Sequence, residues 1–153
     1  GSAQQLRIGY IDSERIVAEA PAFAGVRQTL EREVGPLREE LQRLETELQT
    51  ANEQLQAQAP LLTEQVRQQR QQALQQQFQR YQDRRQQIQQ QVQTREQELL
   101  APVLQRMRAV LEEVRAAGNY TFIIDPPEGV IVAVDPAVDV TAEVMRRLAA
   151  GSN

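Results

Sequence analysis

The stretch LREELQRLETELQ, residues 37–49, spaces its leucines by alternating intervals of four and three. Leucine stands at positions 37, 41, 44 and 48, and the same spacing continues at Ala51 and Leu55. This seven-residue rhythm lines up one apolar seam along a helix, and such a seam faces a partner helix. The stretch therefore predicts one long helix of a coiled coil.

The partner helix is expected from a second apolar series in the same rhythm. Its members are Leu74, Phe78, Tyr81, Ile88, Val92 and Leu99, with Arg85 and Arg95 in two of the slots. Pro60 lies between the two series, and we expect the chain to reverse there because proline lacks a backbone N–H and clashes with the preceding helical turn. We predict a long protruding antiparallel coiled-coil hairpin over residues 25–117, with its tip near residues 58–62.

The two ends of the chain carry strand patterns. Residues 6–11 alternate in polarity, and residues 120–125 and 130–134 are rich in β-branched and aromatic side chains. Each of these segments predicts a strand, with a turn over residues 126–129. The expected fold is α+β and mostly α: a small β-sheet body from residues 6–24 and 118–150, and a helical arm from residues 25–117.

Helix boundaries are expected at proline and glycine. We predict a short helix over Glu14–Glu19 that Pro21 ends, a long helix that begins at Gly25, and a kink or restart at Gly35-Pro36. Gly118 is expected to end the second long helix in the left-handed conformation. A final helix with Val144, Met145 and Leu148 on one face is expected after Asp139 or Thr141.

In a body of about 60 residues a single core is marginally stable without disulfides, a metal or oligomerisation. The chain has no cysteine for disulfides and no histidine for an ordinary metal site. We therefore expect the body to be stabilised by oligomerisation. The residues expected to form this oligomerisation body are Ile8, Tyr10, Phe122, Ile124, Ile131 and Val134.

The charge pattern limits the partners that the protein can have. The net charge is −4, and all 17 basic residues are arginine. An acidic chain argues against a nucleic-acid partner. Residues 31–60 have an excess of Glu and residues 61–98 an excess of Arg. Either the two arms attract each other, or the second arm presents a positive face to an anionic partner.

The composition also argues against an enzyme. Without His, Cys or Lys the chain has no imidazole base, thiolate, usual zinc ligand set or Schiff-base lysine, so no catalytic residue, metal site or cofactor is predicted. Asp125, Asp135 and Asp139 lie at expected strand ends and turns, where aspartate is common.

No apolar run reaches the ~20 residues of a membrane-spanning helix. Gly1-Ser2 is typical of a cleaved tag, and no apolar signal segment precedes Leu6. The protein is therefore either cytosolic or has lost its signal peptide.

More than half of residues 65–93 are glutamine. Glutamine favours helix, but it gives the second arm a dilute apolar seam. Phe78 and Tyr81 are two of the six aromatic residues of the chain. Their side chains either pack in the seam between the two helices or form a contact surface for an apolar binding partner.

The order of these segments resembles the Skp/OmpH family of periplasmic chaperones. The resemblance is carried by IGYID at residues 8–12, EAP at 19–21, GNYTFIID at 118–125 and VDPAVDVTAEVMRRL at 134–148. It implies a homotrimer with a barrel-like body and three arms around a cavity. It further implies a periplasmic location with the signal peptide removed, and ATP-independent binding of unfolded outer-membrane proteins.

Unlike the well-known, strongly basic members of this family, the chain is acidic. Binding of anionic lipid or lipopolysaccharide is therefore left open, and no lipopolysaccharide site is transferred from the family.

Our hypothesis is a holdase, a chaperone that prevents aggregation through many weak contacts acting together. The residues predicted to contact clients are Leu61, Leu62, Phe78, Tyr81, Arg84, Arg85 and Val92. The alternative is an oligomeric coiled-coil tether for one defined partner. A tether is expected to have a continuous strong seam, whereas the second arm has a dilute one.

Overall fold

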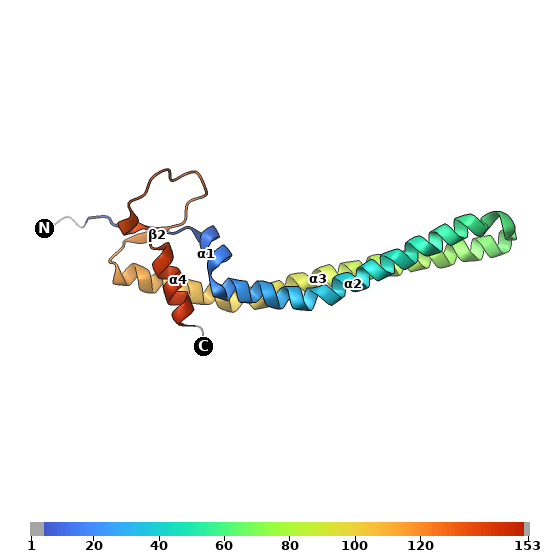
Figure 1. Ribbon diagram of the computed structural model, residues 1–153, viewed down its shortest axis with the longest axis horizontal. Helices are drawn as coiled ribbons and strands as arrows, with labels where there is room; N and C mark the ends of the chain where they lie inside the picture. Colours follow the sequence, from blue (N-terminus) through green and yellow to red (C-terminus); the bar gives the residue numbers. More distant parts are fainter. Residues whose placement is uncertain (1–4, 152–153) are drawn as a thin grey trace. The chain divides into compact units, whose positions relative to one another are not determined.

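Helices dominate the computed structural model, which describes residues 5–151 (Figure 1). In chain order the elements are β1 (Ile8–Tyr10), α1 (Ser13–Glu19), α2 (Pro21–Gln58), the 3-10 turn η1 (Ala59–Leu61), α3 (Glu64–Ala117), β2 (Phe122–Ile124), the 3-10 turn η2 (Pro136–Val138) and α4 (Thr141–Ala150). A mostly helical chain with long helices and a small sheet is therefore confirmed. The expected tag remnant Gly1-Ser2 lies outside the described residues.

The chain divides into two compact units. The first, which we call the helical unit, is Leu30–Glu96. The second, the sheet unit, combines the described residues before Leu30 with those from Gln97 onward. The division into a body at 6–24 and 118–150 and an arm at 25–117 stays a prediction.

Within the helical unit, α2 and α3 lie side by side and are joined by η1 (Figure 1). Pro60 lies in η1, and Thr63 caps α3 by accepting a hydrogen bond from the backbone N–H of Val66 at 3.3 Å. The Arg84 side chain contacts Glu40, and the Arg95 side chain contacts Glu33. The earlier of these two α2 residues, Glu33, thus meets the later of the two α3 residues, Arg95.

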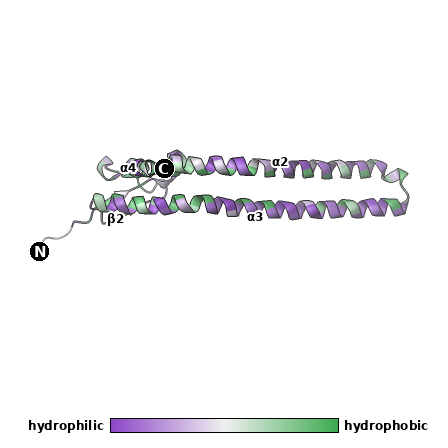
Figure 2. Cartoon of the chain, turned by 90° about the horizontal axis from the view of Figure 1, so that it is seen from below, coloured by the Kyte–Doolittle hydropathy of each residue, from purple (hydrophilic) through white to green (hydrophobic). Residues whose placement is uncertain are grey.

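The apolar seam of the helical unit is thin. Val34 in α2 and Ile88 in α3 are buried, whereas Leu41, Leu48 and most other apolar residues of the seam are only half-buried. Figure 2 shows hydrophobic bands interrupted by broad hydrophilic ones along both helices. Apolar burial between these two helices is consequently modest for their length.

The core of the sheet unit joins residues from both ends of the chain. Its fully buried members include Ile16 of α1, Val110 of α3 and Val144 of α4. The remaining members of this core cluster are Ile11, Ala20, Phe23, Met107, Val114, Tyr120, Val140 and Leu148. The last turns of α3 therefore pack on short elements rather than continuing a two-helix seam.

Strands β1 and β2 pair in parallel, with Ile8 opposite Phe122 and Tyr10 opposite Ile124. Gly9 and Ile123 lie between these pairs and face the core. Gly9 is buried, and a Cβ at this position would lie 3.1 Å from Cγ1 of Ile123. On its other side β1 forms an isolated parallel bridge to Asp139.

The predicted third strand at residues 130–134 is wrong for the single chain, in which this segment pairs with neither strand. Strand-forming residues need a hydrogen-bonding edge, and among the described residues no segment pairs with this one. After Gly129, which has φ of +85°, the segment runs to η2 without joining β1 or β2.

The start of α2 differs from the expectation. Helix α2 begins at Pro21 rather than Gly25, because proline fits the first turn of a helix, where its missing N–H has no partner to lose. Helix α2 includes Pro36, so the chain does not restart a helix there, and the alternative of a kink at Gly35-Pro36 stays a prediction. Helix α3 likewise includes Pro102.

The end of α3 differs from the expectation at one residue. Asn119, not Gly118, has a positive φ, of 55°. Gly118 is needed for another reason: a Cβ at this position would lie 2.3 Å from the Tyr120 ring.

Candidate functional site

The predicted client contacts lie along the turn and the first two-thirds of α3. Leu61 is 86% exposed at the end of η1, and Leu62 follows it, half-buried. Phe78 is 46% exposed, whereas Tyr81 and Val92 are half-buried. Their role in binding clients stays a prediction.

The two predicted polar contacts differ in their surroundings. Arg84 is partly buried and forms an ion pair with Glu40, with 2.8 Å between Nη2 and Oε2. Arg85 is exposed and lines a shallow cavity together with Gln82, Gln86 and Gln89. Arg84 is therefore engaged within the chain, and Arg85 is the more accessible guanidinium.

One further ion pair and one hydrogen bond join α2 to α3. Arg95 Nε lies 2.6 Å from Glu33 Oε2, and this hydrogen bond lowers the pKa of the Glu33 carboxyl. Arg70 near the start of α3 donates to Gln58 at the end of α2. The two ion pairs, Arg84 with Glu40 and Arg95 with Glu33, favour the first interpretation of the charge bias, in which the acidic helix pairs with the arginine-rich one.

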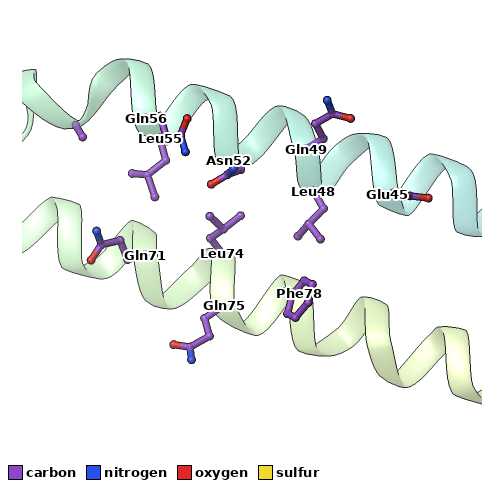
Figure 3. Close-up of a pocket in the computed structure, with 11 residues that line it drawn as sticks. Glu45, Leu48, Gln49, Asn52, Leu55, Gln56, Gln71, Leu74, Gln75 and Phe78 are labelled. Atoms are coloured by element: carbon purple, nitrogen blue, oxygen red, sulfur yellow. The ribbon is translucent and has the colours of Figure 1, made fainter.

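A cleft opens between α2 and α3 close to the turn. Its volume is about 770 Å³, and Leu48, Leu55, Leu74 and Phe78 form its apolar lining. Figure 3 shows Leu48 and Leu55 pointing from α2 toward α3, and Leu74 pointing back toward α2. The remaining lining residues are Glu45, Gln49, Asn52, Gln56, Ala59, Gln71 and Gln75.

The sequence did not reveal this cleft. Leu48, Leu55 and Leu74 fit the seam rhythm and were therefore expected to be closed off by packing. One feature of the sequence does indicate the cleft. Apolar residues are sparse among residues 65–93, where glutamine takes the place of the side chains that would fill the space between the helices. Of the predicted contacts, Phe78 alone lines the cleft.

A second candidate surface is the outer face of the small sheet. Side chains alternate along strands, so Ile8, Tyr10, Phe122 and Ile124 share the face opposite Gly9. Ile8 and Phe122 are exposed, and Tyr10 and Ile124 are half-buried. The predicted oligomerisation residues of both strands thus lie on one accessible apolar face.

The segment Val130–Val134 adds further exposed apolar surface. Val132 is 95% exposed, and Val130, Ile131 and Val134 are also exposed. Solvent-exposed runs of β-branched residues are typical of surfaces that a partner covers. Ile131 and Val134, both predicted to lie in the oligomerisation body, are therefore accessible in the single chain.

Beside this segment lies a small acidic cavity of about 310 Å³. It is lined by Tyr10, Asp12, Asp125 and Glu128, among others. Partial burial, followed by the nearby carboxylates of Asp12, Asp139 and Asp125, raises the pKa of the Tyr10 phenol. Within residues 5–151, no three or more acidic side chains are grouped so that they could hold a metal ion.

No helix in the described part of the chain combines the length and hydrophobicity needed to span a bilayer.

Comparison with known proteins identifies one family. The sequence model of the family described as "Outer membrane protein (OmpH-like)" matches residues 7–148. The comparison with curated proteins finds no similar sequence.

Among solved structures, the chain is similar to a candidate outer membrane chaperone (OmpH-like) from Caulobacter crescentus. The TM-score is 0.76 at 22% sequence identity, and the match covers 97% of this chain and 87% of the other. At this identity the likeness establishes the fold alone. Because the family model spans nearly the whole sequence, the resemblance inferred from the sequence is confirmed, and the chain belongs to the OmpH-like family of outer membrane proteins.

Proposed function

We propose that this protein is an ATP-independent holdase that binds unfolded outer-membrane proteins in the periplasm and prevents their aggregation. The observation that carries this proposal is the OmpH-like family match over residues 7–148. The structural neighbour from Caulobacter crescentus, described as an OmpH-like chaperone, supports the same role.

The proposed assembly is a homotrimer held together through the sheet unit. Its support is the exposed apolar face of β1 and β2 and the unpaired segment Val130–Val134. In the trimer this segment pairs with a strand edge of another copy, which supplies the hydrogen bonds that its own chain lacks. Three copies of the two-stranded sheet then form a barrel-like body.

The proposed client-binding element is the antiparallel hairpin of α2 and α3, three of which enclose a cavity. Exposed apolar residues such as Leu61 and Phe78 support this role, because they are accessible without unfolding the chain. Weak contacts spread over several arms hold a client through their high effective concentration and release it without ATP.

A coiled-coil tether fits the helical unit less well. A tether gains from a closed seam, whereas these helices leave a cleft of about 770 Å³ between them. Such an opening lowers the stability of a rigid spacer, since its lining forfeits apolar contacts.

The test is light scattering from a urea-unfolded outer-membrane β-barrel protein that is diluted into buffer without nucleotide. Increasing amounts of the chaperone should suppress the scattering, with saturation near three chains per client. A sample that is trimeric and helical yet leaves the scattering unchanged would contradict the proposal in favour of the tether.

A further inference from the structure

The cleft between α2 and α3 combines a leucine and phenylalanine floor with a margin of neutral carboxamides. Leu48, Leu74 and Phe78 form the floor, and Asn52 of α2 is one of the carboxamides that line the cleft with them. Its volume of about 770 Å³ lies within the range of ~300–1,000 Å³ that is usual for ligand clefts. The cleft lies entirely within the helical unit.

The charge of the lining restricts the occupant. Glu45, at one end, is the one ionisable side chain among the described lining residues. Carboxamides both donate and accept hydrogen bonds, so they can satisfy the N–H and C=O groups of a peptide backbone whatever its sequence. A neutral polypeptide segment therefore matches the lining, whereas a strongly charged ligand does not.

Two leucines of the cleft, Leu55 and Leu74, are also accessible from a second side. Leu55 and Leu74 also line a smaller cavity of about 280 Å³, which includes Ala51 and Ala73. The alanines leave space that larger side chains would fill in a closed seam. An apolar side chain that enters the cleft therefore meets accessible leucines without displacing a packed core.

The spacing of the floor fits an extended chain. Leu74 and Phe78 are four residues apart on α3, which corresponds to about 6 Å along the helix axis. Alternate side chains of an extended strand are separated by roughly 6.6 Å and point to the same side. Two side chains at positions i and i+2 of an extended segment can thus enter beside Leu74 and Phe78 together.

The length of the cleft gives the size of the segment. From Glu45 to Gln56 the lining of α2 extends over about 17 Å, or roughly five residues of extended chain. We propose that this cleft binds extended, uncharged client segments that carry apolar residues at every second position. That alternation is the sequence pattern of membrane β-barrel strands.

This inference rests on the proposed holdase function and makes it more specific. The arm then does more than offer a generally apolar surface to the client. It recognises the alternation that distinguishes an unfolded barrel strand from an unfolded helical segment of the same composition.

The first experiment compares two fluorescent peptides of identical composition by anisotropy with the full-length protein. One alternates Leu and Thr, and the other places all Leu residues in one block. Only the alternating peptide places every Leu on the same side of an extended chain. We therefore expect it to bind about tenfold more tightly than the block peptide. A tenfold difference in affinity corresponds roughly to the burial of one additional apolar side chain. Equal affinities would overturn the proposal.

The second experiment fills the cleft. Gln71 lines it, whereas the adjacent Gln72 lines none of the cavities described here, and both are exposed glutamines of α3. Gln71→Trp should weaken binding of the alternating peptide about tenfold, and the matched control Gln72→Trp should leave it unchanged. Asn52→Trp provides an independent filling variant from α2.

The same variants in the aggregation assay separate the two proposals. If the wild-type protein suppresses scattering and Gln71→Trp and Asn52→Trp suppress it equally well, the cleft is not the binding site and the holdase function stands. If the wild type does not suppress scattering but prefers the alternating peptide, and this preference is lost in Gln71→Trp, the holdase function fails and the cleft stands as a peptide site. Circular dichroism confirms that each variant keeps its helices.

Discussion

Nη2 of Arg84 lies 2.8 Å from Oε2 of Glu40, an ion pair that joins α3 to α2 across 44 positions of sequence. Both side chains are about one-third exposed, so solvent screens the pair less than it screens a fully exposed one. The contact fixes which turns of the two helices lie opposite each other. Removing the ion pair therefore measures how much a contact between α2 and α3 contributes to the stability of the helical unit.

Replacing Arg84 and Glu40 by alanine, singly and together, should give a coupling free energy of about 1 kcal/mol. Urea unfolding at low and high salt measures this coupling, which should shrink as salt increases. The control pair Arg43 and Glu47 is more exposed, lies 3.9 Å apart and joins neighbouring turns of one helix. It should give about 0.3 kcal/mol. Equal coupling for both pairs would contradict a special role for Arg84.

Replacing Phe78 and Tyr81 by alanine should weaken client retention without changing the oligomeric state. Phe78 is 46% exposed and contributes apolar surface to the cleft, so its removal should mainly affect binding. The aggregation assay measures retention, and light scattering of the purified protein measures its molar mass. Dissociation of the oligomer in this variant would mean that the two aromatic residues are structural.

Val132→Asp should prevent self-association. The side chain is 95% exposed in the single chain, so the substitution removes almost no contact within it. In an interface, by contrast, it would bury an unpaired carboxylate. The molar mass should therefore fall from three times 17.4 kDa to that of one chain. Leu61→Asp, at another exposed apolar residue, is the control and should leave the oligomer intact.

Acid should destabilise the fold through Glu143. This carboxylate accepts hydrogen bonds from Arg146 and Arg147, which lower its pKa from 4.5 to about 2. Unfolding frees the carboxylate to bind a proton at a higher pH, so the stabilisation is complete above pH 4.5 and declines as the pH falls toward about 2.

The measurement is the urea midpoint of unfolding at a series of pH values. In Glu143→Gln the decline between about pH 5 and about pH 3 should be smaller than in the wild type. It should not vanish, because arginines also lower the pKa values of Glu33 and Glu112. An identical decline in both proteins would exclude Glu143 as a contributor.

Two glycine-to-alanine substitutions should have opposite effects. Gly118→Ala places a Cβ 2.3 Å from the buried Tyr120 ring and should destabilise the protein by about 1–3 kcal/mol. Gly25→Ala lies within α2, where no atom other than the adjacent backbone of the helix itself lies within 4 Å of the new Cβ, and should stabilise the protein by about 0.5–1 kcal/mol. Thermal unfolding followed by circular dichroism distinguishes the two directions. A stabilising Gly118→Ala would contradict the close packing of Tyr120.

The parts of the fold that follow from local chemistry were predictable from the sequence. The leucine spacing at residues 37–48 predicted a long helix, and the β-branched residues around Ile8 and Ile123 predicted the two strands. Helix starts are less predictable: α2 begins at Pro21, where the sequence predicts the end of the preceding helix. Proline is compatible both with the end of one helix and with the first turn of the next, and only the surrounding packing selects between them.

Features that depend on more than one segment were not predictable. Residues 130–134 have strand propensity, but propensity cannot show whether a partner edge is present. The heptad rhythm likewise identified Leu48 and Leu74 as seam residues, yet whether a seam closes depends on the side chains around it. For this reason the cleft emerged only from the three-dimensional arrangement of residues that had each been assigned a packing role.

The parallel register of Ile8 with Phe122 also constrains the order of folding. The two strands are separated by the whole of α1, α2 and α3, so the sheet cannot form until synthesis has passed residue 124. Contacts this distant in sequence form slowly, whereas helices form from neighbouring residues. As the chain emerges from its N-terminus, the long helices can therefore form early, while the N-terminal strand remains unpaired. The emerging chain thus has, for a time, the same need for protection from aggregation that it is proposed to meet for others.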